Sequence, residues 1–343
     1  MVMIGGYRFI FSADPANTQA MAIMYFCIGC CALCCNLFNV YIFYSLQRHS
    51  KKYKLFIALE VGEIVNCIAY ISTGAGRYAT FESGTIFQPI TTLGCFLYRP
   101  WSVFLLMGTQ IPAALIMISV VERLTAVFRP STYQRVWDEK FKTKAILLVV
   151  LLELCSLGLA FYSAWSDTIP NGTSHCPVTA AVSSLYGNFH FIFTVLTFTI
   201  SFFSLAFVYF SKREMISSKG GQGYFLATMT LTGICVIVMG FPAIVSLGNA
   251  WNLYQAGDLF FGISICAPSL ISIATTFSNG MFHKDYRRKV YQMVGRRFGC
   301  HLSSRDESSF KDKVTIMPTT IFSSVQRKST LTAGITLSVA PMA

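Results

Sequence analysis

The stretch SVVERLTAVFRPSTYQRVW, residues 119–137, marks a boundary between two kinds of sequence. It follows an apolar run that begins near residue 96, and its first charges are the adjacent Glu122 and Arg123. The chain then becomes basic and meets Pro130, which disfavours continuation of a helix. A helix needs roughly 20 apolar residues to cross a bilayer. The stretch therefore predicts a membrane-spanning helix that ends in a basic, proline-interrupted loop.

The composition of the whole chain agrees with a membrane protein. Of its 343 residues, 54% are hydrophobic and only 12% are charged, whereas about a quarter are charged in soluble domains. The net charge of +12 falls between apolar runs. Because a nucleic-acid-binding protein carries its basic residues on one face of a soluble fold, we do not expect nucleic acid as a partner. The N-terminal residues lack the pattern of a cleaved signal peptide.

Seven apolar runs are long enough to cross a membrane. They are continuously apolar and lack the period-two alternation of barrel strands, so we expect an all-α bundle of seven transmembrane helices over residues 20–281. The predicted spans are 20–45, 55–75, 96–122, 143–165, 185–210, 223–248 and 258–281.

The basic residues predict the orientation of this bundle. Of the 27 Lys and Arg, all but Arg8, Arg77 and Arg99 lie in four segments on one side of the predicted membrane. Short basic loops are retained in the cytoplasm, so the segment 1–19 is expected outside the cell and the C-terminus inside. The four basic segments are 46–54, 123–144, 211–222 and 282–343.

The loop after the fourth span carries two features of an outside face. Asn171-Gly172-Thr173 is an N-glycosylation sequon, which predicts a glycan on Asn171. Cys176 lies in the same loop, and Cys95 lies beside the third span. Both cysteines would face the oxidising side of the membrane, where a disulfide can form and persist.

Residues 27–35, CIGCCALCC, have a spacing similar to that of metal ligands. Thiolates in hydrocarbon need a metal to compensate their charge, and no His or carboxylate lies nearby, so we favour packing between helices over a metal site. No cofactor or metal is expected. Nor do we expect an enzyme, since the chain lacks HExxH, Gly-x-Ser-x-Gly and phosphate-loop motifs.

Three carboxylates within the spans keep a transporter or channel open as an alternative, because intramembrane charge is costly and often functional. They are Glu60, which we expect to be exposed near a membrane boundary, Glu63 and Glu153. Against this class, the chain shows no internal repeat and no matching pair of Gly/Pro-broken helices.

The residues around Arg123 carry a resemblance to known receptors. The acid–arginine pair resembles the Asp-Arg-Tyr element of rhodopsin-like G-protein-coupled receptors. The longer string ERLTAVFRPSTYQRVW looks more like nematode serpentine chemoreceptors of the gamma superfamily, including class gamma and class V. The arginine, Thr-Ala, Pro, Tyr and Trp of those receptors match Arg123, Thr125-Ala126, Pro130, Tyr133 and Trp137. With seven spans, the resemblance extends over about residues 20–300.

The resemblance implies a chemosensory receptor of the cell membrane, and of sensory cilia, that serves olfaction. It would bind a small external molecule and activate a heterotrimeric G protein. Glu122, Arg123 and Pro130 would take part in G-protein coupling. The cysteines Cys95 and Cys176 would form the disulfide that joins the third helix to the second outer loop.

The resemblance also implies where helices bend and where a ligand binds. Pro242 and Pro268 match the kink prolines of the sixth and seventh helices. The ligand would enter a cavity between the outer halves of spans three, five, six and seven. Chosen for depth and chemistry, the candidate ligand-binding residues are Met107, Gln110, His190, Phe191 and Ser246.

Several positions depart from the receptor pattern. Leu124 replaces the tyrosine of the Asp-Arg-Tyr element. The sixth span has VMGFP in place of Cys-Trp-x-Pro, and Ala267 and Ile271 replace two polar residues of the seventh. In partial agreement, Asn36 or Asn39 would match the asparagine of the first helix and Glu63 the acid of the second.

Residues 282–300 predict a basic amphipathic helix on the anionic inner leaflet, with membrane lipid as partner. Cys300 at its end is a candidate for palmitoylation. The segment 301–343 is rich in Ser and Thr, and we expect it to be disordered. The apolar face of the helix comprises Phe282, Tyr286, Val290, Met293 and Val294.

Overall fold

The structure is a computed structural model, which describes residues 2–4, 7–9, 14–48, 53–212, 222–250 and 258–297. The expected disordered tail 301–343 and the candidate Cys300 lie outside these ranges. The chain divides into two units, Met1–Lys289 and Val290–Ala343. The architecture that follows is that of the first unit.

Within the described ranges, seven helical segments are long and apolar enough to cross a membrane. This confirms the predicted all-α bundle of seven helices, and the chain is a multi-pass membrane protein. The first six lie in α1 (Pro15–Gln47), α2 (Lys54–Glu82), α4 (Pro100–Phe128), α6 (Glu139–Ser166), α8 (Ser184–Ser211) and α10 (Gln222–Ala250). The seventh span consists of α11 (Asp258–Cys266), a 3₁₀ turn η3 (Ala267–Ser269) and α12 (Leu270–Phe282).

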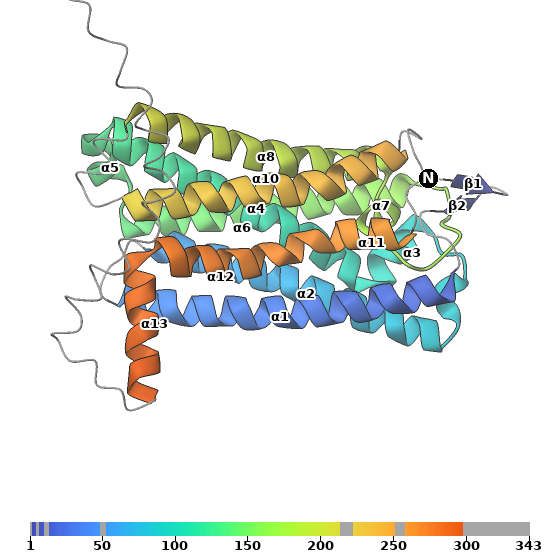
Figure 1. Cartoon of the computed structure of the whole chain (residues 1–343). Helices are drawn as coiled ribbons and strands as arrows, with labels where there is room; N and C mark the ends of the chain where they lie inside the picture. The colour runs from blue at the N-terminus through green and yellow to red at the C-terminus, as the bar shows by residue number, and fades with distance from the viewer. Residues whose placement is uncertain are drawn as a thin grey trace, which may run out of the picture. The chain divides into compact units, whose positions relative to one another are not determined.

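The connections between these helices gather at two ends of the bundle (Figure 1). The end at the right of Figure 1 holds α3 (Thr92–Tyr98) and α7 (Val178–Ala181), and we name it the disulfide end. A short hairpin of β1 (Val2–Ile4) and β2 (Tyr7–Phe9), which the sequence analysis did not predict, lies there too. The opposite end carries α5 (Pro130–Val136), and we name it the α5 end.

Side-chain caps begin several of the helices where the sequence has Asp, Ser or Thr. These side chains accept hydrogen bonds from backbone N–H groups that the first helical turn leaves unpaired. Asp14 accepts from Ala16 N at 3.0 Å, Asp138 from Phe141 N at 2.7 Å, and Ser183 from Tyr186 N at 3.3 Å. Thr91 caps α3 in the same way, from Gly94 N at 2.9 Å.

The third span differs from its predicted bounds at both ends. Arg99 has extended-side backbone angles (φ −122°, ψ 80°) and separates α3 from α4, which starts with Pro100 in its first turn. The helix therefore begins four residues after the predicted residue 96 and continues past Glu122 and Arg123 to Phe128. Pro130 does interrupt the helix, but it starts the short helix α5, where proline at the first position is favoured, rather than a loop.

The second span is longer than predicted and ends at Glu82 instead of residue 75. Arg77 is therefore a residue of α2 and not of a loop, and its side chain is only 1% exposed. Hydropathy alone ended the span before this charge. The structure shows that a single cation can remain inside a helix when the neighbouring polypeptide covers it.

Helix α13 (Lys284–Arg297) occupies most of the predicted amphipathic segment 282–300. The preceding helix ends at Phe282, and His283 is extended (φ −94°, ψ 99°), so the chain turns between the two helices. On the first unit's side of this turn, Tyr286 is buried among residues of α1 and donates to Asn39 Oδ1 at 2.7 Å.

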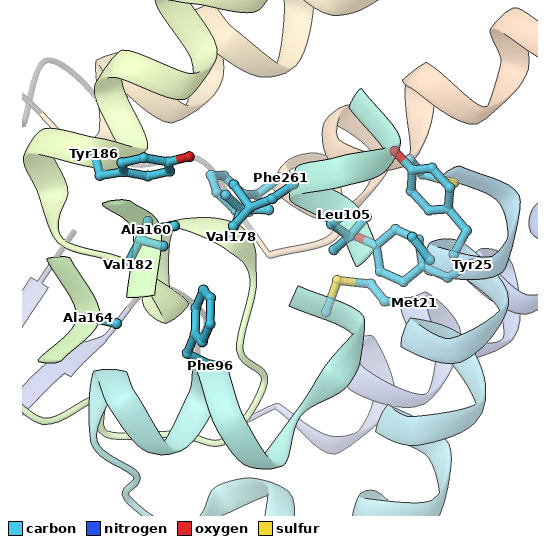
Figure 2. Packing of buried hydrophobic residues seen from close by; sticks show 14 of the residues in the cluster. Met21, Tyr25, Phe96, Leu105, Ala160, Ala164, Val178, Val182, Tyr186 and Phe261 are labelled. Atoms are coloured by element: carbon cyan, nitrogen blue, oxygen red, sulfur yellow. The ribbon is translucent and has the colours of Figure 1, made fainter. Parts of the chain in front are cut away.

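An apolar cluster joins the helices in the half of the bundle near the disulfide end (Figure 2). Because α3 and α7 contribute to it, the connecting segments at this end are packed as part of the core and do not lie on its surface. The cluster includes Met21 and Tyr25 of α1, Phe96 of α3, Leu105 of α4, Val178 of α7, Tyr186 of α8 and Phe261 of α11.

The cysteine cluster of α1 was expected to pack between helices, and for three of its members this is wrong. Cys27, Cys31 and Cys34 are exposed, since their spacing of four and three residues places them on one outward helix face. Cys30 and Cys35 are half-buried. In the part of the chain that the structure describes, no group of three or more His, Cys, Asp or Glu is arranged to hold a metal ion.

Candidate functional site

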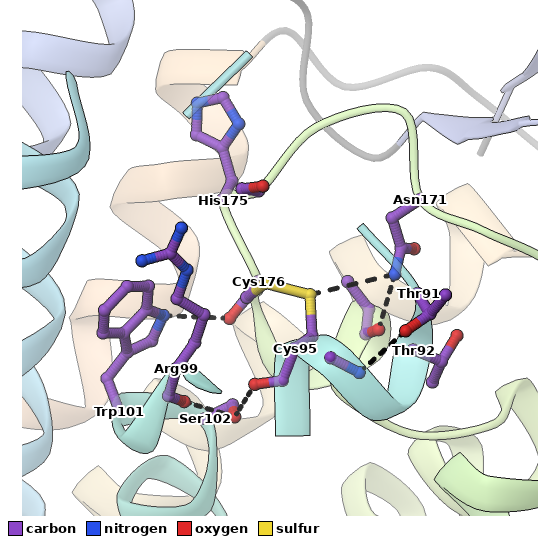
Figure 3. Close-up of a disulfide and its surroundings, with 12 residues drawn as sticks. Thr91, Thr92, Cys95, Arg99, Trp101, Ser102, Asn171, His175 and Cys176 are labelled. Carbon is purple, nitrogen blue, oxygen red and sulfur yellow. Dashed lines mark hydrogen bonds between the residues drawn. A yellow bond between two sulfur atoms is a disulfide. The ribbon is translucent and has the colours of Figure 1, made fainter. Parts of the chain in front are cut away.

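A disulfide fastens the connection between α6 and α8 to α3. The sulfur atoms of Cys95 and Cys176 are bonded (Figure 3), which is the pair that the receptor resemblance implies. Cys176 has a φ of 44°, in the left-handed region that is unusual for a residue with a side chain. Its carbonyl accepts a hydrogen bond from Trp101 Nε1 at 3.2 Å, so α4 also holds this turn.

The segment 171–182, which follows this anchor on both sides, is buried almost throughout. Its backbone forms a short antiparallel bridge with Ile90, from Ile90 N to Asn171 O at 3.0 Å and from Asn171 N to Ile90 O at 2.8 Å. Ser174 N donates to Ile86 O at 2.7 Å. These bonds satisfy backbone groups that burial would otherwise leave unpaired. The segment is therefore a packed layer over the helices at the disulfide end, and we name it the disulfide layer.

Burial of Asn171 does not support the predicted glycosylation. The residue is 2% exposed, and its Nδ2, the atom that would carry the glycan, donates to Ala180 O at 2.9 Å (Figure 3). A glycan needs surface exposure. The sequon motif identified the residue types but could not show that the loop folds inward.

We therefore expect the folded protein to carry no glycan on Asn171. Treatment with an N-glycosidase should leave its electrophoretic mobility unchanged, because the acceptor nitrogen is buried and already donates a hydrogen bond. Thr173→Ala, which destroys the sequon but keeps Asn171, should migrate identically. A mobility shift that disappears in Thr173→Ala would contradict this expectation.

Two buried residues attach the disulfide layer to the first two helices. His175 Nε2 lies 3.0 Å from Thr18 Oγ1 of α1, and Arg77 Nε of α2 donates to His175 O at 3.0 Å. The Arg77 guanidinium also lies over the ring of Tyr25, 5.1 Å from its centroid. Sequence reasoning missed both residues, although a lone arginine at the end of an apolar run was a usable signal for Arg77.

His175 should make the stability of the disulfide layer depend on pH. Burial, and then the nearby Arg77 charge, lower the pKa of His175 to about 3 from its usual 6.5. The unfolded segment therefore binds a proton that the folded one does not, and stability falls as the pH drops from 6.5 toward 3. Between pH 7 and pH 5 the loss should be roughly 2 kcal/mol. Thermal unfolding across this range should show it, and His175→Gln should remove this part of the pH dependence. Equal pH dependence in both proteins would contradict the assignment.

A small cavity lies next to the disulfide layer, between α4, α8, α10 and the seventh span. Its volume is about 30 Å³, enough for about two water molecules. Two of the predicted ligand-binding residues, His190 and Phe191, line it, and so do both predicted kink prolines, Pro242 and Pro268. The other three candidates, Met107, Gln110 and Ser246, are not among its lining residues.

Gln110 lies behind the cavity wall in a buried hydrogen-bond chain that crosses three helices. Its Nε2 is 2.8 Å from His190 Nδ1, and its Oε1 accepts from Ser156 Oγ at 2.9 Å. Ser156 Oγ is in turn 2.7 Å from the hydroxyl of Tyr186. The chain fixes the orientation of the His190 ring. Sequence reasoning missed Ser156 and Tyr186, since small hydroxyls are common in membrane helices.

At the α5 end, Glu122 and Arg123 are both buried in contacts with other helices. The acid that we expected to neutralise Arg123 forms an ion pair with Lys142 of α6, with Nζ 2.5 Å from Oε1, and accepts from the Tyr133 hydroxyl of α5 at 3.3 Å. The Arg123 guanidinium lies over the ring of Phe56 in α2, 5.5 Å from its centroid. These residues therefore connect α4 to α2, α5 and α6.

Glu60 and Glu63 take part in a third polar cluster, between α1, α2 and α12. The expectation that Glu60 is exposed is wrong, since it is 1% exposed and accepts from Asn39 Nδ2 at 3.0 Å. Glu63 accepts from Ser272 Oγ at 3.3 Å, and Ser272 Oγ accepts from Asn36 Nδ2 at 3.0 Å. The cluster joins the first two helices to the last span.

Comparison of the sequence with models of known protein families finds no match, and comparison with curated proteins finds none either. The functional inference therefore depends on the residues themselves. They form a small cavity near the disulfide end and a buried charged cluster at the α5 end, with a polar cluster between α1, α2 and α12.

Proposed function

We propose that the chain is a chemosensory receptor that binds a small external molecule in the cavity and activates a heterotrimeric G protein at the α5 end. The motif around Arg123 and the seven-helix layout support a receptor that resembles the nematode gamma superfamily. The Lys- and Arg-rich connections support a cytoplasmic α5 end, and the disulfide supports an outside location of the opposite end. By the same resemblance we propose the membrane of sensory cilia as its location.

The observation that carries the proposal is that one helix reaches both sites. Leu105 and Thr109 of α4 line the cavity, and Glu122 and Arg123 of the same helix lie in the charged cluster. A movement of α4, or of the helices packed on it, therefore changes both sites together. Helix packing of this kind switches between discrete arrangements because cores deform poorly.

The described arrangement has the features of a closed, inactive state. The cavity is too small for an organic molecule, and Glu122 and Arg123 are 7% and 8% exposed. A ligand shifts the equilibrium only if it binds the open state better than this one. Widening of the cavity at Pro242 of α10 and at the η3 interruption would part the helices and expose Arg123 to a G protein.

The test is stimulated nucleotide exchange on purified G proteins by the full chain in nanodiscs, across a panel of small odorants and water-soluble cues. We expect some members to raise exchange and Arg123→Ala to abolish the rise. Arg48→Ala is the matched control, since Arg48 is an exposed cation at the same end and should leave the response unchanged. A response unaffected by Arg123→Ala would remove this residue from coupling.

A transporter or channel is the second candidate, and the buried Glu60 and Glu63 favour it. Their hydrogen bonds to α1 and α12 would let a bound ion affect several helices at once. Proton or cation flux into liposomes that hold the purified chain without any G protein, lost in Glu63→Gln, would establish this candidate in place of the receptor.

A further inference from the structure

The wall of the cavity offers few groups for hydrogen bonding to a ligand. None of its twelve lining residues is acidic, Lys or Arg. The hydroxyls of Tyr70, Thr109 and Thr194 donate to the backbone carbonyls of Ile265, Leu105 and His190, at 2.7, 2.9 and 2.8 Å. Polar capacity that the described residues leave over is found on the His190 ring and on Thr179 Oγ1, which has no hydrogen-bond partner among them.

The hydrogen-bond chain behind His190 determines which ring nitrogen carries the proton. The ring is 2% exposed and has no carboxylate beside it in the cavity wall, so it is neutral, because an isolated buried charge is too costly. Gln110 Oε1 accepts from Ser156, so the Gln110 amide turns its N–H toward His190 Nδ1, 2.8 Å away. Nδ1 therefore accepts, and the proton lies on Nε2.

The Nε2–H group is held only weakly by the protein. It lies 3.3 Å from Thr109 Oγ1, beyond the usual N–H···O distance of about 2.9–3.0 Å. Since the Thr109 proton is already donated to Leu105 O, Thr109 is the acceptor in this contact. A better acceptor placed in the cavity would replace it at little cost, because water and polar groups are otherwise sparse there.

We propose that the cavity binds a small uncharged molecule with a carbonyl oxygen, such as a ketone, aldehyde or ester, and that His190 Nε2–H donates to this oxygen. The proposal rests on the receptor function above and names its ligand class. His190 contacts the ligand, and Gln110 is a positioning residue that selects the donor form of the ring. Amines and carboxylates are disfavoured, since the wall holds no counter-charge for them.

Such a ligand also accounts for coupling to the two interrupted helices. A molecule of several carbon atoms exceeds the roughly 30 Å³ of the closed cavity, so binding has to displace part of the wall. Pro242 and Pro268 are in that wall, and Pro268 lies in the η3 turn, a 3₁₀ interruption of the kind that marks hinges. The carbonyl would thus orient the ligand while its apolar body moves α10 and the seventh span.

The test uses pairs of molecules that differ only in the acceptor. Cyclohexanone and methylenecyclohexane have nearly the same shape, as do an open-chain ketone and its methylene analogue. With the full chain in nanodiscs, we expect the ketone of each pair to bind about tenfold more tightly, as one good hydrogen bond provides. His190→Phe, which keeps a ring but removes the donor, should bring this ratio to one. His190→Gln, which restores a donor, should recover part of it, and cyclohexylamine should bind more weakly than the ketone.

A readout on the unaltered chain guards against misfolding of the variants. The nuclear magnetic resonance signal of isotope-labelled His190 Nε2 should move with cyclohexanone and stay in place with methylenecyclohexane. Equal or undetectable binding of both members of every pair, with no such movement, would overturn the ligand class even if other cues stimulate G-protein exchange. Ketone selectivity that depends on His190 but never stimulates exchange would instead sustain the ligand class and reject the receptor function.

Discussion

Gly74→Ala should cost the folded bundle about 3 kcal/mol and sharply reduce the yield of monodisperse protein. A Cβ atom at Gly74 of α2 would lie 2.5 Å from Phe26 N and 2.6 Å from Ala22 O of α1. Both neighbours are backbone atoms, so the clash is relieved only if the two helices move apart along their length. Small residues that permit such close approach are a main source of helix association in membranes. Thermal unfolding of the purified chain measures the loss.

Gly158→Ala is the matched control for this substitution. Gly158 lies within α6, and a Cβ added there would meet nothing within 4 Å. Because glycine disfavours a helix by about 1 kcal/mol relative to alanine, this variant should be neutral or slightly more stable. If the two variants unfold at the same temperature, close packing of α1 on α2 is not what Gly74 provides.

The second large effect is expected from Lys142→Ala, which should destabilise the chain by about 3–5 kcal/mol. Lys142 and Glu122 are buried, with side chains 5% and 9% exposed, and removal of the lysine leaves the Glu122 carboxylate buried without its cation. Breaking a buried pair costs more than never having had it, since the desolvation of the remaining charge is no longer offset. The unfolding temperature should fall accordingly.

Two further variants make this prediction specific. Glu122→Leu combined with Lys142→Met removes both charges and should recover most of the stability lost in Lys142→Ala, because no buried charge remains. Lys144→Ala, an exposed position two residues away on α6, should change stability by less than about 0.5 kcal/mol. Failure of the double variant to recover stability would show that the lysine acts through packing instead of charge.

The seven spans could be predicted because length and hydropathy are properties of the chain alone. The exact ends could not, because they depend on neighbours. Arg77 stays helical since the disulfide layer covers it and accepts its hydrogen bond, and nothing in the local sequence shows this contact. Asn171 illustrates the same limit, because a sequon specifies residue types and not whether the loop that carries it is buried.

The candidate site was predicted in part, and helix geometry explains the difference. Depth along the span placed Met107 correctly between Leu105 and Thr109, which both line the cavity. A helix turns by about 100° per residue, so residues four apart share a face while Met107 points away from it. The face that looks inward is set by the packing of α4 on its neighbours, and a single sequence does not contain that information.

The disulfide layer has a consequence for the timing of a response. Val178 and Thr179 of this covalently anchored segment close the cavity on one side, so a molecule must wait for a rare opening before it can enter. Capture would then be governed by the frequency of opening rather than by diffusion, and it would reach a ceiling as the concentration rises. Departure would be slow for the same reason. A sensor built in this way would report the recent history of its surroundings and average over brief fluctuations.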